Sequence, residues 1–499
     1  MGGLILSLDQ GTTSSRALLF DDQLNLRAMA QEEFAQIYPH PGWVEHDADA
    51  ILETSLACAR RVLEKAGVAA SELAAIGVTN QRETVVLWDR QTGRPLHHAL
   101  VWQDRRTSEL CQKLASEGHG PLIAEKTGLV LDPYFSATKL KWLLDEVPGA
   151  RAAAERGALC FGTIECWLIW HLTGGHSHKT DATNASRTML YNIVDGQWDE
   201  DLLALFDVPP ALLPEVVDCD GDFGVTAASV LGAQVPIRGA AGDQQAALIG
   251  QACFEPGQMK ATYGTGCFAV LNIGAEPVVS SSNLLTTLAY QLDGKRTYAL
   301  EGSIFIAGAA VQWLRDEVGL IEAARECDQL AASSNLDDPV CLVPAFTGLG
   351  APYWRANARG ALMNLTRGTG RAEIVRATLE SVGLQTYDLY QAMMKDWPDL
   401  AKTDRVLRVD GGMSASEWTM QFVADMLDCP IDRPQLAETT ALGAAYLAGR
   451  GAGLCPDLGE FAHDWAVDKR FEPVLTAAER ACKVERWGLA VAGVLAAEG

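Results

Sequence analysis

Residues 4–20 have the sequence LILSLDQGTTSSRALLF, and this stretch decides the fold of the first half of the chain. Two apolar runs, at residues 4–8 and 17–20, predict a pair of β-strands. The segment between them is short and rich in small hydrogen-bonding residues, which is typical of a turn. The sequence therefore predicts a β-hairpin with a polar tip.

The polar tip has the chemistry of a polyphosphate site. It offers backbone N–H groups after Gly11, three hydroxyl groups and a guanidinium. The candidate phosphate ligands are Thr12, Thr13, Ser14 and Arg16. Asp9, at the end of the first strand, is placed to hold Mg²⁺ through water. A tight turn with a paired surface arginine explains these residues equally well, so the tip alone does not decide between the two interpretations.

Further signals alternate between strand and helix along the whole chain. Strands are predicted at residues 74–79, 84–89, 258–263 and 267–273, and helices at 50–66, 108–117, 307–317 and 372–394. This alternation predicts a mixed α/β architecture with two similar halves.

A chain of 499 residues is too long for one hydrophobic core, which stops growing at roughly 250–300 residues. The motifs place a boundary near residues 251–257, predicting domains at 1–252 and 253–499. The net charge of −24 opposes binding to nucleic acid or anionic lipid, because both attract clustered cations.

The cysteines and the chain start favour a cytoplasmic protein. The 12 cysteines form no Cys-x-x-Cys pair, which leaves zinc and redox motifs without support. The first residues carry no basic region or cleavage site, and no apolar run reaches the length that a membrane helix needs. We therefore expect reduced thiols, no export signal and no membrane insertion.

Two turns in the second half add phosphate-binding character. Residues 263–266, Tyr-Gly-Thr-Gly, lie between two predicted strands. Residues 407–412, Leu-Arg-Val-Asp-Gly-Gly, end a strand before a helix predicted at 414–427. Glycines let the backbone approach a phosphate or a nucleotide ring closely. Neither turn matches the dinucleotide or the P-loop pattern, which disfavours both of those classes.

Two further strand ends carry polar pairs. Residues 80–83, Asn-Gln-Arg-Glu, follow a strand that we expect to be buried, and ligands commonly sit at such ends in α/β sheets. Asp243 precedes a small-residue helix, where a carboxylate can accept a proton from a hydroxyl. A salt-bridged strand end and a helix N-cap are the structural alternatives. Trp102 and Tyr134 would supply an apolar wall and a hydroxyl, although aromatic residues are more often core.

Several of these stretches together resemble the FGGY carbohydrate kinases, nearly end to end. The stretches that carry the resemblance are residues 8–16, 39–47, 77–84, 181–190, 242–247, 262–266 and 344–354. Within that family, Asn80-Gln81-Arg82-Glu83 points to the branch that phosphorylates glycerol rather than to kinases of xylulose, gluconate or ribulose.

The resemblance implies two ribonuclease-H/actin-like ATPase domains with an active-site cleft between them. It implies that ATP and Mg²⁺ act on glycerol to give sn-glycerol 3-phosphate, with Asp243 as general base and Asp9 and Asp243 supporting the metal. The implied glycerol ligands are Arg82, Glu83, Trp102, Tyr134, Asp243, Gln244 and Phe268. The implied ATP ligands are Thr12, Thr13, Ser14, Arg16, Thr265, Gly308, Gln312, Gly411, Gly412 and Ser416.

Three departures from the family pattern bear on nucleotide binding and regulation. Asn364 stands where the family has Gly, and Ser416 stands where it has an Asn near the adenine, which puts nucleotide affinity and selectivity in question. Residues 229–236 lack the Gly-Gly-x-Arg loop for an allosteric sugar bisphosphate.

Two alternatives stay open from the sequence: a kinase of another polyol or ketose, and a non-catalytic nucleotide-binding regulator. On the same resemblance we expect a homodimer or homotetramer.

Overall fold

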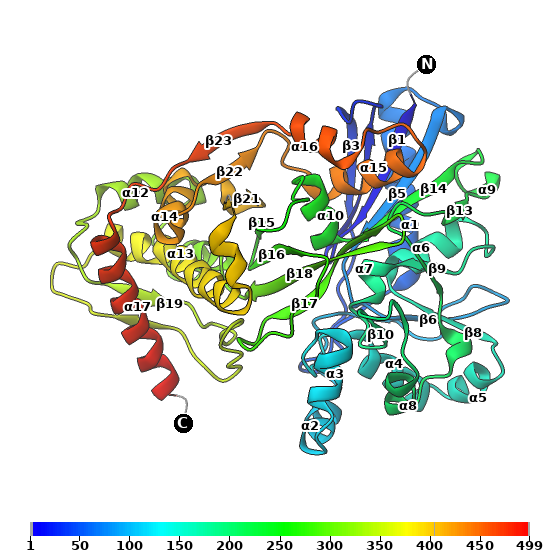
Figure 1. The fold of residues 1–499 in the computed structure, drawn as a ribbon, viewed down its shortest axis with the longest axis horizontal. Coiled ribbons are helices and arrows are strands. Elements are labelled where there is room, and N and C mark those ends of the chain that lie inside the picture. Colours follow the sequence, from blue (N-terminus) through cyan, green and yellow to red (C-terminus); the bar gives the residue numbers. More distant parts are fainter. Residues whose placement is uncertain (1–2, 404, 498–499) are drawn as a thin grey trace.

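The computed structural model describes residues 3–403 and 405–497. It contains two large mixed sheets, one built from each half of the chain, with helices packed against them (Figure 1). The first sheet has the order β13-β14-β5-β1-β2-β3 and the second the order β17-β18-β16-β15-β21-β22-β23. The predicted two-domain α/β architecture is confirmed.

Both sheets repeat one topology. In the first, β1 pairs antiparallel with β2, β2 antiparallel with β3, and β5 and β14 continue parallel on the other side of β1. In the second, β15 pairs antiparallel with β16, while β21 and β22 continue parallel. The bounds of these strands are β1 Leu4–Gln10, β2 Ser14–Phe20, β3 Leu26–Glu33, β5 Leu73–Asn80, β13 Gly224–Val225, β14 Pro236–Gly242, β15 Gln258–Tyr263, β16 Cys267–Gly274, β17 Leu285–Leu292, β18 Lys295–Ile304, β21 Val406–Asp410, β22 Ile431–Pro434 and β23 Val467–Phe471.

Helices cover both sheets and bury separate cores. The longer ones are α1 Ala48–Ala66, α2 Ser108–Ser116, α4 Ser136–Glu146, α6 Ile164–Leu172, α10 Asp243–Gly250, α11 Gly308–Asp316, α13 Arg371–Asp396, α14 Glu417–Leu427, α15 Thr439–Gly451 and α17 Ala477–Ala496. Apolar residues of α1 and α6 join β1 and β5 in one cluster, and those of α13 and α14 join β15 and β21 in another. Each half therefore has its own hydrophobic core, as the length of the chain requires.

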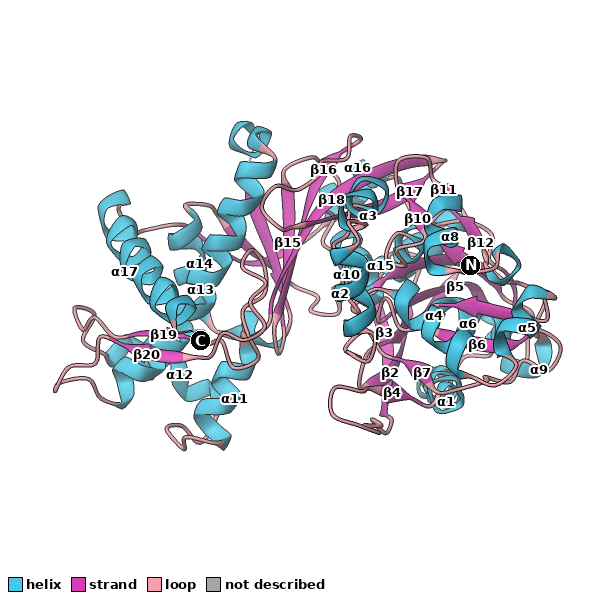
Figure 2. Cartoon of the chain, turned by 90° about the horizontal axis from the view of Figure 1, so that it is seen from below, coloured by secondary structure: helices cyan, strands magenta, loops and turns pink. Residues whose placement is uncertain are grey.

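Helix α15 belongs to the second half of the sequence but packs on the first sheet. Figure 1 shows it in orange beside the blue strands β1 and β5. Figure 2 shows α10 and α15 next to each other between the two lobes, where the first lobe is the part built around the first sheet and the second lobe the part built around the second. Their crossing is close because small residues face each other: a Cβ at Gly443 would overlap the carbonyl oxygen of Ala246. The two lobes are thus joined through a pair of tightly packed helices.

Most predicted elements are confirmed, with small shifts at their ends. The hairpin at residues 4–20 and the strand at 258–263 form as expected. The strand predicted at 84–89 is shorter, β6 Val86–Asp89, and pairs with β8 Leu159–Gly162 outside the main sheet. The helix predicted from residue 414 begins only at Glu417, because residues 412–415 form a 3₁₀ turn. No helix in the described part of the chain combines the length and apolar character that crossing a bilayer demands.

Candidate functional site

Three of the predicted loops meet at one edge of the first sheet. Strands β1, β5 and β14 are parallel neighbours, and Asn80 lies opposite both Gln10 and Gly242. The segments that follow these strands therefore leave the sheet side by side. This edge, at the carboxyl ends of parallel strands, is where ligands commonly bind in α/β sheets.

The hairpin tip forms a compact turn beside an indole. The amide of Gly11 donates to the carbonyl of Ser14 at 2.9 Å, and the indole Nε1 of Trp102 donates to Thr12 Oγ1 at 3.0 Å. Thr13 is exposed, whereas Ser14 is buried and its hydroxyl accepts a hydrogen bond from Gln31 at 3.0 Å. The tip thus offers Thr12 and Thr13 most directly to a ligand.

Arg16 is not an isolated surface residue. Its Nη1 lies 3.0 Å from a carboxylate oxygen of Glu438, which comes from the second half of the chain, and 3.9 Å from Asp9. A phosphate bound at the tip would meet this guanidinium next to two carboxylates. The ion pair between Arg16 and Glu438 links the hairpin tip to the segment that leads into α15.

Asp243 is the first residue of α10, so the N-cap interpretation of this residue is wrong. Gly242 occupies the N-cap position, and Asp243 Oδ1 accepts a hydrogen bond from the amide of Gln244 at 2.7 Å. The same oxygen lies 3.1 Å from Arg82 Nε. A third of the Asp243 side chain (33%) is exposed, against 2% for Arg82, so this carboxylate faces open space.

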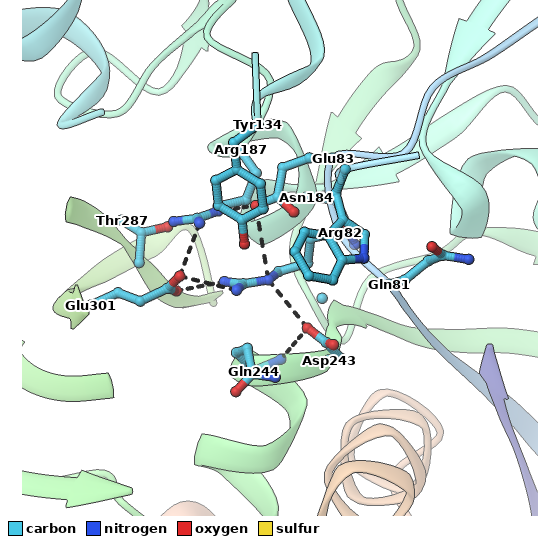
Figure 3. Close-up of polar contacts among 12 residues, drawn as sticks. Gln81, Arg82, Glu83, Tyr134, Asn184, Arg187, Asp243, Gln244, Thr287 and Glu301 are labelled. Carbon is cyan, nitrogen blue, oxygen red and sulfur yellow. Dashed lines mark hydrogen bonds and ion pairs between the residues drawn. The ribbon is translucent and has the colours of Figure 1, made fainter. Parts of the chain in front are cut away.

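Arg82 belongs to a buried chain of charges (Figure 3). Its Nη1 and Nη2 donate to the two carboxylate oxygens of Glu301, at 2.5 and 3.0 Å. Arg187 donates to Glu301 at 2.9 Å and to Glu83 at 2.6 Å. Along this network, Asp243–Arg82–Glu301–Arg187–Glu83, the charges alternate in sign. Each buried charge therefore has an opposite partner that offsets the cost of its burial.

The shifted pKa values reflect burial and these pairings. Burial opposes ionisation of Glu301, but Arg187 and Arg82 outweigh it and lower the pKa of that carboxyl to about 2. Burial raises the pKa of Glu83, against the attraction of Arg187. Burial also works against the charge of Arg82, yet Glu301 holds its pKa well above the usual value. The guanidiniums and Glu301 are therefore charged throughout the working pH range.

An aromatic wall stands over this network. The ring centroids of Trp102 and Tyr134 are 5.6 Å apart, and those of Trp102 and Phe268 are 6.4 Å apart. Phe268 comes from β16 in the second half of the chain. Burial raises the pKa of the Tyr134 hydroxyl, which therefore stays protonated and can donate a hydrogen bond. The three rings thus present apolar faces together with one hydroxyl donor.

Gln244 is held by a buried lysine. Lys260 Nζ donates to the amide oxygen of Gln244 and, at 2.9 Å, to Thr262 Oγ1. Because an ammonium is only a donor, it fixes the amide oxygen toward itself and turns the Gln244 amide nitrogen the other way. Burial lowers the pKa of Lys260.

The second half presents two turns at the ends of adjacent parallel strands. The turn at 264–266 follows β15, and Gly411 and Gly412 follow β21. The carbonyl of Thr265 accepts from the amides of Ala307 and Ala309, at 2.9 and 3.0 Å, which binds this turn to the start of α11. Gly308 and Gln312 lie on α11, so five of the nucleotide candidates gather around one helix start and one sheet edge.

Glycine is required at one of these turns. Gly411 has a φ of +85°, and a Cβ there would come within 2.5 Å of the carbonyl oxygen of Tyr263. Next to it, Gly412 is exposed, and a Cβ built on it would meet nothing within 4 Å. The backbone after β21 is thus open to a flat ligand.

Ser416 is engaged within the protein. It is the N-cap of α14, its hydroxyl accepts from the amide of Thr419 at 3.1 Å, and it donates to Asp328 at 2.5 Å. Its one hydroxyl proton is therefore used inside the fold. Asn364, the other departure, is exposed with φ +60°, a conformation that Asn tolerates better than most residues.

The acidic residues here fit Mg²⁺ in type and number. Burial is the main cause that raises the pKa of Asp9 to about 6, opposed by Arg16 and helped by Asp243 and Glu438. Mg²⁺ usually takes one or two protein carboxylates together with water and phosphate oxygens. In the described part of the chain no three His, Cys, Asp or Glu side chains group tightly enough to hold a metal alone. Two carboxylates, Asp9 and Asp243, near the hydroxyl-bearing hairpin tip match that preference.

Sequence reasoning missed Arg187, Glu301 and Lys260 as members of this site. Arg187 lies inside the stretch 181–190 that carries the family resemblance, but no local pattern assigns it a role. Lys260 is the one charge of the largely buried strand β15, and Glu301 is the one charge in the buried part of β18, whose other charges stand at its exposed start. A lone charge in a buried strand is unusual and is the signal that could have found them.

Comparison with known proteins identifies the family. Residues 4–250 match the N-terminal domain, and residues 259–452 the C-terminal domain, of the FGGY family of carbohydrate kinases. The chain belongs to this family.

Similar proteins within it are glycerol kinases. The chain is 61% identical to the glycerol kinase of Rhodopseudomonas palustris over 99% of both chains, and 61% identical to that of Allorhizobium ampelinum over the full length of both. The crystal structure of Plasmodium falciparum glycerol kinase with ADP superposes with a TM-score of 0.93 at 36% identity, covering 99% of this chain and 98% of that one. A gluconate kinase from Lactobacillus acidophilus, at 23% identity and a TM-score of 0.88, shares the fold.

Proposed function

We propose that this protein is an ATP-dependent glycerol kinase, which transfers the γ-phosphoryl group of ATP to glycerol and releases sn-glycerol 3-phosphate and ADP. The glycerol kinases similar to it over their full length support the substrate. The relative crystallised with ADP supports the nucleotide.

The single observation that carries the chemistry is the exposure of Asp243. In the charge network Asp243–Arg82–Glu301–Arg187–Glu83, every other side chain is at most 2% exposed, whereas 33% of the Asp243 side chain is exposed. A carboxylate fixed by a helix start and an arginine, yet open on one side, is placed to accept a proton from a bound hydroxyl. Asp243 is the general base of the proposal.

Glycerol would lie between the charged network and the aromatic wall. Arg82, Glu83 and the amide nitrogen of Gln244 offer hydrogen bonds to its hydroxyls, and Tyr134 adds a donor. Trp102 and Phe268 face its carbon backbone. A site that pairs every substrate hydroxyl rejects analogues that lack one, because its buried polar groups would be left unpaired.

ATP would bridge the two lobes. Thr12, Thr13, Ser14 and Arg16 hold the phosphates from the first sheet, and Thr265, Gly308, Gln312, Gly411 and Gly412 hold the nucleotide from the second. The hydroxyl of Ser416 is bound to Asp328, so Ser416 would contribute to nucleotide binding only by shaping the start of α14. Asp9 and Asp243 would hold Mg²⁺ near the phosphates, where the metal neutralises the charge that phosphoryl transfer develops.

Several further points stay predictions. They are the domain limits 1–252 and 253–499, a cytoplasmic location, and a homodimer or homotetramer without nucleic-acid partners. Sedimentation at working concentration tests the last, and a monomer would contradict it.

A coupled ADP-release assay tests the proposed function. The assay uses ATP and Mg²⁺ with glycerol, dihydroxyacetone, xylulose, ribulose and gluconate, and compares the wild type with Asp243→Asn. We expect the highest kcat/KM with glycerol, and a loss of about 10²- to 10⁴-fold in the variant.

The variant keeps the hydrogen bond to the Gln244 amide, so it should fold normally. A preference for a pentulose or gluconate would show that the protein is a kinase of the same family with a different substrate. Absence of turnover with all five would leave a nucleotide-binding regulator.

A further inference from the structure

A buried carboxylate of the second lobe reaches Arg82, a residue of the proposed glycerol site in the first. Glu301 lies on β18, 219 positions beyond Arg82, and is 1% exposed. In the sheet its neighbours are Val270 on β16 and Leu285 on β17, both apolar. The side chains of these neighbours cannot donate a hydrogen bond, so among the described residues the hydrogen-bond partners of this carboxylate are the two arginines, and the charge of Lys260 adds a favourable attraction.

Glu301 occupies one edge of the Arg82 guanidinium. A guanidinium has five N–H donors. On Arg82, Nη1 donates to Glu301 and, at 3.3 Å, to Gln245, while Nη2 gives one hydrogen to Glu301. Nε forms an ion pair with Asp243, whose Oδ1 lies 3.1 Å away. Among the described residues one Nη2 hydrogen has no acceptor and can meet a ligand, on the edge that also carries Nε.

Glu301 acts on Glu83 through Arg187. Arg187 is fully buried, and it donates from Nη2 to Glu301 and from Nε to Glu83. Its Nη1 is buried without a hydrogen-bond partner among the described residues. One oxygen of Glu83 is thus occupied by Arg187, and the other, Oε2, takes no hydrogen bond from the described residues. Figure 3 shows Glu301 reaching both arginines from the side opposite Asp243.

Without Glu301, Arg82 would pair more strongly with the carboxylate of Asp243. Arginine and carboxylate prefer a bidentate pair, and Asp243 is the closest remaining carboxylate. The guanidinium would then turn its donors toward the base rather than toward a substrate hydroxyl. Glu301 and Asp243 therefore compete for the guanidinium of Arg82, and the winner sets its orientation.

We propose that Glu301 is a positioning residue of the glycerol site, which holds Arg82 and, through Arg187, Glu83 in the orientation that binds the substrate. This inference rests on the proposed function. It means that the substrate site of the first lobe is complete only when β18 of the second lobe is docked against it.

Three variants test the proposal. Glu301→Gln keeps the shape but presents an amide nitrogen to one arginine, so one charged hydrogen bond is lost. Glu301→Asp keeps the charge but is one carbon too short to reach both arginines. Glu380→Gln is the matched control, since Glu380 is also buried and pairs with Lys483 at 2.7 Å on α13 and α17.

The expected result is a selective loss of glycerol binding. For Glu301→Gln and Glu301→Asp we expect KM for glycerol to rise about 10- to 100-fold, the range of a lost hydrogen bond to a charged group. KM for ATP should change less than about threefold, as an interaction confined to the other substrate implies. Calorimetric titration of glycerol without nucleotide should show the same weakening, and the control variant should behave as the wild type.

Analogues lacking one hydroxyl give a readout that a purely structural role would not move. The penalty of Glu301→Asp should shrink with one of the two propanediols, 1,2 or 1,3, namely the one lacking the hydroxyl that Arg82 binds. Equal penalties with all three alcohols would overturn the proposal, as would a Glu301→Asp variant with wild-type glycerol affinity. If the wild type neither binds nor phosphorylates glycerol, the proposed function itself fails, which is a different outcome.

Discussion

Asp9→Asn should make the metal-free protein more stable while removing its activity. Asp9 lies at the end of β1 with 10% of its side chain exposed, and burial raises its pKa from the ordinary 3.8 to about 6. The folded chain therefore binds the Asp9 proton more tightly than the unfolded chain. Stability is lost as the pH rises from about 4 to about 6, because folding must then bury an ionised carboxylate.

The size of the effect follows from the rise of the Asp9 pKa from 3.8 to about 6. Each unit is worth about 1.4 kcal/mol, so ionised Asp9 costs the wild type about 3 kcal/mol at pH 7.5. At pH 4.5 most of the folded protein carries the proton, and the cost falls to about 1 kcal/mol. Asparagine has no charge to bury, so the variant should gain these amounts. The value of about 6 already includes the opposing attraction of Arg16.

Urea unfolding in EDTA at pH 4.5, 6.0 and 7.5 measures the difference in free energy of unfolding between the two proteins. Turnover with Mg²⁺ and ATP should fall at least about 100-fold in the variant, since stabilisation of charge by a metal is worth several kcal/mol. A variant that is no more stable than the wild type at pH 7.5, or whose advantage grows toward acid pH, would refute the reasoning.

Asp388→Asn is the matched control for this experiment. Burial raises the pKa of Asp388 to about 6 as well, but its partners are Tyr353 and Trp487, at 2.7 and 2.6 Å, in the second lobe. It should show the same trend of stability with pH and keep full turnover. Loss of activity in both variants would mean that the activity effect is not specific to Asp9.

Three other changes have defined outcomes. Gly443→Ala should lower the free energy of unfolding by more than about 3 kcal/mol in a urea titration, because its methyl group overlaps the carbonyl of Ala246 at the α10–α15 crossing. Ser416→Ala should cost about 1 kcal/mol of stability by the same measurement, as loss of an N-cap does. The KM of Ser416→Ala for ATP should change less than about threefold, since its hydroxyl is bound to Asp328; a larger increase would place that hydroxyl on the nucleotide. Lys260→Met should raise KM for glycerol by about tenfold in steady-state kinetics, because the glutamine amide it fixes can then rotate; unchanged KM would contradict this role.

The sequence determined the local parts of this protein because their physics is local. The apolar runs of residues 4–8 and 17–20 and the small residues between them predict the hairpin, and the hairpin forms. Gly264 and Gly411 mark turns for the same reason, since backbone conformation depends on the residues in the turn itself. The loops after β1, β5 and β14 could be named as ligand sites because their polar residues follow apolar strands.

The tertiary structure decided which charges act together. Whether Asp243 caps its helix or keeps one side open depends on where α10 begins and on Arg82, which comes from the loop after β5. Arg187 and Glu301 reach the site from positions 104 and 114 residues away from their partners, and no pattern along the chain relates such positions. Buried ion pairs are fixed by the packing of whole sheets, so only the folded molecule shows them.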